Sequence, residues 1–312
     1  MSTKSYGGHG GPPHQSFYMT NCYRFWLRPF ICIFLPWTIG LLVGAVPAHP
    51  CTLFAAAGSR VEGGGTLIAK NRDRQPRLSA LKIFTPPGGF RFLGLIDATS
   101  VKQPAVAGVN EKGLVVVDAT ASSLPARERR GDAVSLTEKV LAACASVDAA
   151  LARKEIFARH PAFHMLADGQ KIATVEVAPG GQVVVTVRDR GVLGHTNHYT
   201  DGRLEWANRL LKESSWVRQA RIWELLAGCR KPLTLKDFIS FSQDRDDGPD
   251  NSIWRTGGKP RATRTLATWI VAQPQGQAPR VYVKIANPGE PEQTYDLPLD
   301  RAFWQKGRVQ FP

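Results

Sequence analysis

Hydrophobic and polar residues alternate in short runs along most of the chain after residue 50, and these runs end at glycines or at Asp-Gly and Gly-Gly pairs. Such runs predict β-strands joined by tight turns. The first hairpin is expected where "CTLFAAAGS" and "GTLIAKNRD" flank the glycine-rich "RVEGGG". Further strands are expected in "LKIF", "FRFLGLIDA", "PAVAGVNEKGLVVVDAT" and "AFHMLADGQKIATVEVAPGGQVVVTVRD". The last two, "RTLATWIVAQ" and "RVYVKIAN", precede an extended tail.

Helical spacing replaces this alternation in three places. "SLTE" at 135–138 predicts a capping box, and two short amphipathic segments follow to about residue 155. "TLKDFISFSQD" predicts another helix, capped by Thr234 with Asp237 three positions on. Residues 203–228 predict a long helix whose apolar stripe contains Leu204, Leu210, Leu211, Val217 and Trp223.

Strand blocks therefore alternate with helix pairs and not with single helices. This order favours an α+β protein with antiparallel sheets covered by helices over a doubly wound parallel sheet. The chain has 312 residues, 43% of them hydrophobic, which suffices for one large packed domain.

The N-terminal region differs from the rest. Residues 30–46, "FICIFLPWTIGLLVGAV", carry no charge and follow two arginines, while Val46 and Ala48 provide small residues for signal-peptide cleavage. We expect residues 1–50 to be a disordered extension plus a removed leader, and residues 51–312 to be a single domain that is periplasmic or secreted. Two alternatives stay open: a retained inner-membrane anchor, for which the run is short, and a buried core helix.

The charge of the chain limits the kinds of partner that it can bind. The formal net charge of +14 favours anionic partners, but the basic residues are scattered and no block is interleaved with aromatics. We therefore expect no nucleic-acid partner.

Cys144 and Cys229 either pair in an oxidising compartment or remain small buried hydrophobes. No set of side chains has the spacing of a complete metal site, so neither metal nor cofactor is expected.

Cys51 opens the first predicted strand, directly after the removable segment. If it becomes the first residue, its α-amine, with an ordinary pKa of about 8, lies beside its thiol and can take the thiol proton at neutral pH. On the partner strand, Asp73 could hold this amine, and Lys70 or Arg72 could lower the pKa of the thiol. Asn197 in "GHTNHY" is a neutral donor suited to an oxyanion. The alternative is that Cys51 is an ordinary buried strand residue.

These motifs stand in a characteristic order. "CTLFAAAGS", "AKNRD", "GVNEKGLVV" and "GHTNHY", followed by "NSIWRTG" ahead of "RTLATWIVAQ", resemble the cysteine N-terminal-nucleophile (Ntn) amidases. This group includes the choloylglycine hydrolases and the isopenicillin-N acyltransferases and is related to acid ceramidase. The resemblance covers most of residues 51–290. It implies a four-layered αββα sandwich and attack on a linear amide, followed by hydrolysis or acyl transfer.

The resemblance also implies roles for individual residues. Cys51 matches the nucleophile, Asp73 the acid that positions its amine, and Asn197 the oxyanion-hole donor. Lys70 stands where the bile-salt amidases usually carry arginine. A lysine lacks the planar fork of a guanidinium, which Arg72 could supply instead.

Later positions match less closely. Thr120 falls where those enzymes often have a second asparagine, and its hydroxyl is a candidate donor. Arg255 is the best match for a late arginine of the site, with Arg264 as its rival. Trp254, beside Arg255, is a candidate wall of an acyl pocket.

Together these features predict an exported amidase for a small acyl-amide substrate, with membrane contact only through the leader. Cleavage after Ala48 leaves His49 and Pro50 attached, so a second cut must expose Cys51. We expect autoproteolysis by the Cys51 thiol, or an unusual cleavage directly after Pro50. Two alternatives stay open: acyl transfer to an amine, and an inactive, membrane-tethered binding protein in which Lys70 and Thr120 mark decay of the site. The particular amide and the oligomeric state stay open.

Overall fold

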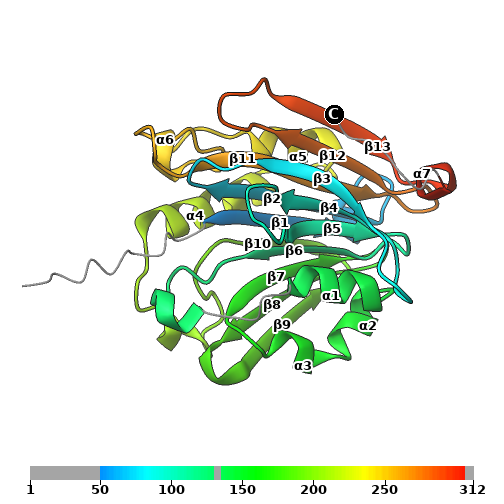
Figure 1. Ribbon diagram of the computed structural model, residues 1–312, viewed down its shortest axis with the longest axis horizontal. Helices are drawn as coiled ribbons and strands as arrows, with labels where there is room; N and C mark the ends of the chain where they lie inside the picture. Colours follow the sequence, from blue (N-terminus) through cyan, green and yellow to red (C-terminus); the bar gives the residue numbers. More distant parts are fainter. Residues whose placement is uncertain (1–49, 130–134, 306–312) are drawn as a thin grey trace, which may run out of the picture. The chain divides into compact units, whose positions relative to one another are not determined.

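Two antiparallel β-sheets lie face to face in the computed structural model, which describes residues 50–129 and 135–305 (Figure 1). The six-stranded sheet has the order β10-β1-β2-β11-β12-β13. Its strands are β1 (Cys51–Ala57), β2 (Thr66–Arg74), β10 (Gly191–His195), β11 (Arg264–Gln273), β12 (Arg280–Ile285) and β13 (Gln293–Pro298).

The seven-stranded sheet follows chain order from β3 to β9. Its strands are β3 (Ser79–Phe84), β4 (Phe92–Asp97), β5 (Ala105–Asn110), β6 (Val115–Ala119), β7 (Ala162–Ala167), β8 (Ile172–Ala178) and β9 (Gln182–Arg188). Every pair of neighbouring strands in both sheets is antiparallel.

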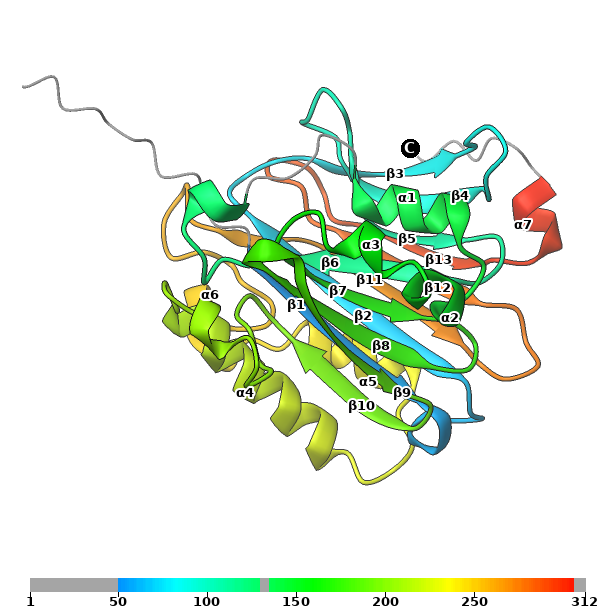
Figure 2. The same ribbon diagram turned by 90° about the horizontal axis from the view of Figure 1, so that it is seen from below.

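Helices cover the outer faces of both sheets. The described α-helices are α1 (Leu136–Ala143), α2 (Val147–Leu151), α3 (Lys154–Phe157), α4 (Glu213–Gly228), α5 (Leu235–Ser242), α6 (Gly248–Asn251) and α7 (Arg301–Gln305). α1, α2 and α3 pack on the seven-stranded sheet, whereas α4 and α5 pack on the six-stranded sheet (Figures 1 and 2). The predicted four-layered αββα sandwich of the α+β class is confirmed.

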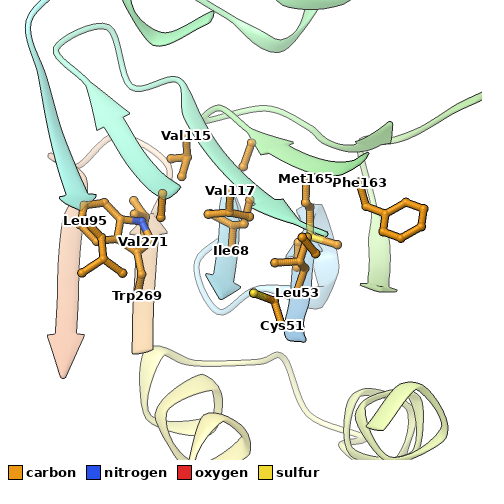
Figure 3. Close-up of a cluster of buried hydrophobic side chains, with 14 of the residues drawn as sticks. Cys51, Leu53, Ile68, Leu95, Val115, Val117, Phe163, Met165, Trp269 and Val271 are labelled. Atoms are coloured by element: carbon orange, nitrogen blue, oxygen red, sulfur yellow. The ribbon is translucent and has the colours of Figure 1, made fainter. Parts of the chain in front are cut away.

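A hydrophobic core fills the space between the two sheets. Leu53 and Ile68 from one sheet meet Val117 and Met165 from the other (Figure 3). Because successive side chains of a strand point to opposite faces, Leu53 lies in this core while its neighbour Phe54 packs under the helices. The six-stranded sheet is therefore buried on both faces near its centre, which explains the almost continuous apolar sequence of β1.

The β1–β2 hairpin is confirmed, and its register pairs Cys51 with Arg72. The turn depends on glycine: the φ angle of Gly65 is 82°, and a Cβ atom there would lie 2.0 Å from the main-chain oxygen of Gln273. This turn fixes the register of the two strands that carry Cys51, Lys70 and Asp73.

The helix predicted over residues 203–228 begins only at Glu213, after a turn and a short 3₁₀-helix (Glu205–Ala207). Its predicted apolar stripe is wrong. Leu204 is buried outside the helix, and the residues that α4 itself buries are Ser215, Arg218, Ile222 and Leu226.

Several large apolar side chains of this region face away from the core. Trp206 and Trp216 are each about half exposed, at 52% and 51%. Leu210, Leu211 and Trp223 are also exposed, whereas Trp254 is buried. The physical reason is the phase of the helix: Trp216 and Trp223 are seven residues apart and so share a side of α4, which is separate from the stripe that the helix buries.

The two capping boxes predicted at the starts of helices have different outcomes. The capping box at Thr234 and Asp237 is confirmed. The one at Ser135 and Glu138 is wrong, because both side chains bind the main chain of Ala105 and so attach α1 to β5. The expected extended tail contains β13, which pairs with β12, and then α7.

Of the two alternatives left open for Cys144 and Cys229, the disulfide is wrong. Among the described residues, Cys51, Cys144 and Cys229 are all free. Cys144 is buried under α1–α3, whereas Cys229 ends α4 on the opposite outer face, so a Cys144–Cys229 disulfide is excluded by the layering.

The predicted leader lies outside the described residues, except for Pro50. All described residues belong to one compact unit. Within them, no helix combines the length and apolar character needed to cross a membrane.

Candidate active site

Cys51 is the first residue of β1, and its side chain lies at the margin of the core between the sheets (Figure 3). The residue is only 5% exposed, and burial raises the pKa of its thiol. The positive charge of Lys70 lowers this pKa, while the charges of Asp73 and Asp118 raise it. The thiol is therefore neutral at pH 7 and needs a base to become a nucleophile.

The main chain of Cys51 is held at both ends by buried side chains. Its nitrogen donates to Asn197 Oδ1 at 2.8 Å, and its oxygen accepts from Arg218 Nη1 at 2.6 Å. Arg218 Nη2 also donates to Asn197 Oδ1, at 2.9 Å. The nucleophile candidate thus sits in a closed hydrogen-bond network with α4 and the segment after β10.

Two hydrogen bonds, one from its main chain and one from its side chain, fix the position of Asn197. Its main-chain nitrogen donates to Ser215 Oγ at 3.1 Å, and its Nδ2 donates to the main-chain oxygen of Thr120 at 2.9 Å. The side-chain oxygen consequently faces the nitrogen of Cys51, an orientation set by this network. In the structure Asn197 thus binds the nitrogen of Cys51 through its side-chain oxygen. Its role as the oxyanion donor stays a prediction.

Asp73 is fully buried on β2, on the face that meets the helices. Its Oδ1 accepts from Thr265 Oγ1 at 2.8 Å, and its Oδ2 has no hydrogen-bond partner among the described residues. Burial raises the pKa of this carboxyl group, and the charges of Arg218 and Arg255 oppose that shift. An unsatisfied buried carboxylate oxygen beside Cys51 suits an ammonium or amine donor.

The two predicted cations on β2 have different surroundings. Lys70 Nζ donates to Asp118 Oδ1 at 2.5 Å and to the main-chain oxygen of Val106 at 2.7 Å. Arg72 instead donates to Ser79 and pairs with Asp97, with 3.1 Å between Nη2 and Oδ2. Burial lowers the pKa of Arg72 to about 10, so it remains charged at pH 7. Lys70 is the cation that lowers the pKa of the Cys51 thiol.

Arg255 lies between two cavities. A cavity of about 100 Å³ is lined by Pro50, Asn197, Arg218 and Arg255 among others. A second, of about 320 Å³, is lined by Arg255 and by Arg245, Trp254 and Arg264. Arg255 is buried, and its Nε and Nη1 have no hydrogen-bond partner among the described residues. A buried guanidinium of this kind suits an anionic group of a ligand.

The remaining predicted residues line two of the cavities. Trp254 packs beneath Arg245 and Lys284, whose charged groups lie 5.9 Å and 4.9 Å from its ring centre. Arg264 lines the larger cavity with it. Thr120 touches Asn197 through its main-chain oxygen and lines a third cavity of about 290 Å³. Its hydroxyl shows no contact with Cys51.

Sequence reasoning missed three residues of this site: Arg218, Asp118 and Thr265. For Arg218 a signal existed, because it lies on the same helical stripe as Ile222 and Leu226, where a charged residue is unexpected. Thr265 became recognisable only when strand pairing placed it beside Asp73, and Asp118 only when the packing of the two sheets placed it beside Lys70. In the described part of the chain, no three His, Cys, Asp or Glu side chains gather as a metal site requires.

Comparisons with known proteins identify the family and support the fold. Residues 60–290 match the family model described as acyl-coenzyme A:6-aminopenicillanic acid acyl-transferase. A search of curated protein sequences finds no match.

Two solved structures share the fold. Penicillin V acylase from Agrobacterium tumefaciens is similar with a TM-score of 0.53 and 14% identity, over 81% of this chain and 89% of the other. A mutant of conjugated bile acid hydrolase from Clostridium perfringens is similar with a TM-score of 0.50 and 14% identity, over 80% of this chain and 92% of the other.

Proposed function

Because this chain belongs to the acyl-coenzyme A:6-aminopenicillanic acid acyl-transferase family of the Ntn-hydrolase superfamily, we propose that it cleaves a linear acyl amide with Cys51 as nucleophile. One observation supports this most: the nitrogen and oxygen of Cys51 are both bound by buried side chains, Asn197 and Arg218. A strand residue of the core needs no such network, because its main chain pairs with neighbouring strands. The network suits a residue whose position must be maintained after the chain is cut.

The proposed chemistry requires removal of everything before Cys51. In the intact chain the nitrogen of Cys51 forms a peptide bond with Pro50, which is half-buried and lines the smaller cavity with Asn197 and Arg218. Its loss would free an amine beside Asn197 Oδ1 and enlarge the space next to the thiol. We infer export through a leader, with the last cut made either by Cys51 itself or by a protease. A retained inner-membrane anchor is the alternative location.

Catalysis follows from the free amine. The α-amine takes the thiol proton as the sulfur attacks the amide carbonyl, and a tetrahedral oxyanion forms. The C–N bond then breaks, the α-ammonium returns the proton to the leaving amine, and a thioester on Cys51 remains. Water, or a second amine, attacks the thioester with the same α-amine as base. Asp73 holds the ammonium through its unsatisfied oxygen, and Asn197 remains the predicted oxyanion donor.

The larger cavity indicates the kind of substrate. Arg245, Arg255 and Arg264 gather there with Trp254 and outnumber the two carboxylates of the cavity, Glu290 and Glu292, of which Glu292 pairs with Lys284. This surplus of positive charge favours an amide whose amine part or acyl part carries a carboxylate next to a flat apolar group. Penicillin V and conjugated bile acids, which name the two similar structures, are the first substrates to test.

Acyl transfer is the second candidate, because the matching family is named for that reaction. In this case the acyl group of the thioester passes to an amine in place of water. Adding an amine acceptor such as 6-aminopenicillanic acid to the assay separates the two: a transferase forms a new amide, whereas a hydrolase releases only the free acid.

The experiment that tests the proposed function compares the full-length wild type with Cys51→Ala and with the matched control Cys144→Ala. Cys144 is also buried and free, but it lies under the opposite helix layer. We expect wild type and Cys144→Ala to release the acyl group and Cys51→Ala to be inactive, with no acyl adduct by mass spectrometry.

Two outcomes contradict parts of this proposal. Equal activity of Cys51→Ala and wild type would exclude Cys51 as the nucleophile, and an inactive wild type that still binds amides would favour a binding protein. Complete leader removal in Cys51→Ala would exclude autoproteolysis and assign the cut to a protease.

A further inference from the structure

Arg218 is the basic side chain most fully enclosed by this site. It projects from α4, is 0% exposed, and donates to three groups around the nucleophile. Its Nη1 reaches the oxygen of Cys51 at 2.6 Å and Thr52 Oγ1 at 2.8 Å, and its Nη2 reaches Asn197 Oδ1 at 2.9 Å. An aliphatic residue would fill this helical stripe at a far smaller desolvation cost, so packing alone does not account for an arginine here.

We propose, on the basis of the function proposed above, that Arg218 is a positioning residue that fixes the main chain of Cys51 and keeps its newly freed α-amine unprotonated. The first part follows from the contacts. Arg218 binds the oxygen of Cys51 directly and the nitrogen indirectly, because Asn197 Oδ1 accepts from both Cys51 and Arg218. The clamp does not involve residue 50, so it persists when the preceding peptide bond is cut.

The second part follows from charge. The nitrogen of Cys51 and Nη2 of Arg218 lie 2.8 Å and 2.9 Å from the same oxygen atom. An α-ammonium at this position would face a guanidinium across one shared acceptor, so the neutral amine is favoured. Burial lowers the pKa of Arg218 to about 10, and the guanidinium therefore keeps its charge at pH 7. A neutral amine is the form that can accept the thiol proton.

Other charged residues near the Cys51 α-amine include some that favour its protonation and some that oppose it. Among the described residues, those that interact electrostatically with Cys51 or Arg218 are Lys70, Arg72, Asp73 and Arg74 on β2, Asp118 on β6, Arg255 after α6, and His198 after β10. Asp73 favours an ammonium, which is needed after proton transfer, and Arg218 opposes it. Burial lowers the pKa of His198 to about 4, so it adds no charge at pH 7.

The test is a titration of the Cys51 α-amine in the processed protein that is recovered after expression of the full-length chain with ¹³C-cysteine. The NMR signal of Cys51 is assigned by its loss in Cys51→Ser. Four proteins are compared: wild type, Arg218→Gln, Arg218→Lys and Arg221→Gln. Arg221 is the matched control, because it lies on the same helix but pairs with Asp244. We expect Arg218→Gln to raise the amine midpoint by about 1–2 pH units, since a nearby positive charge is lost. Arg218→Lys and Arg221→Gln should stay near wild type.

An unchanged midpoint in Arg218→Gln would overturn the role of Arg218 and leave the proposed function intact. If Arg218→Gln does not fold, Arg218→Lys decides: a midpoint more than about one unit above wild type overturns the charge argument, because the charge is still present. A wild-type Cys51 whose nitrogen does not titrate, because Pro50 remains attached, would overturn the proposed function together with this inference.

Discussion

Asp118→Asn removes the charge that pairs with Lys70 and so tests whether this pair controls the thiol of Cys51. Lys70 is 1% exposed and the Asp118 side chain 34% exposed, with 2.5 Å between Nζ and Oδ1. Breaking a fully buried pair costs about 3–5 kcal/mol. Because Asp118 is partly solvated and Lys70 keeps the main-chain oxygens of Val106 and Asp118 as acceptors, we expect a loss of about 1–3 kcal/mol in the free energy of unfolding.

The same substitution should change the reactivity of the thiol. The negative charge of Asp118 raises the pKa of Cys51, so its removal lowers that pKa and speeds alkylation by iodoacetamide at pH 7. Mass spectrometry compares the alkylation of Cys51 with that of the buried Cys144, which reports general opening of the fold.

Urea unfolding measures the stability change: with a slope of about 3 kcal/mol per molar, the midpoint should fall by roughly 0.3–1 M. Asp148→Asn, which breaks the surface pair with Lys171, is the matched control and should leave the midpoint unchanged. An unaltered midpoint for Asp118→Asn, or no rise in the ratio of Cys51 to Cys144 alkylation, would refute the reasoning.

Three further predictions concern other parts of the molecule. Arg264→Ala should raise KM about tenfold for carboxylate-bearing amides with kcat little changed, because a cation leaves the larger cavity; an equal effect on an uncharged amide in steady-state kinetics would exclude this role. Gly65→Ala should destabilise the protein by about 2–4 kcal/mol, since the added Cβ would meet the oxygen of Gln273, and calorimetry should show no such loss for Gly202→Ala, where nothing lies within 4 Å. Burial lowers the pKa of His164 to about 4, below its unfolded value of about 6.5, so its contribution to stability is complete above pH 6.5 and is lost as pH falls towards 4. His164→Leu should therefore flatten the fall of the urea midpoint over this range, and an equally steep fall would show that other groups are responsible.

Much of the sheet structure was predictable because the relevant signals are local. The glycines of the β1–β2 turn, Gly65 above all, fix a hairpin whose strands carry Cys51 and Asp73. Once these two residues share a hairpin, their proximity follows from the register alone. The prediction of a site built on Cys51, Asp73 and Asn197 therefore needed only turn chemistry and motif order.

The rest depends on contacts that no local pattern encodes. The phase of α4 was misjudged because exposed tryptophans of the helix and exposed leucines just before it resemble a buried stripe, and Arg218 was overlooked for that reason. The orientation of Asn197 depends on Thr120, which lies 77 positions earlier in the chain. Cavity walls combine residues from several elements, so the location of Arg255 between two cavities could not be read from its neighbours in sequence.

The measurement that tests the central claim most directly is the intact mass and N-terminal sequence of the active protein, taken from the exported fraction of its host. We expect a chain that begins at Cys51, with a free α-amine held by Asn197 and Arg218. An active chain that begins at His49 or earlier would contradict it, because the nitrogen of Cys51 would then be an amide and could not act as the base.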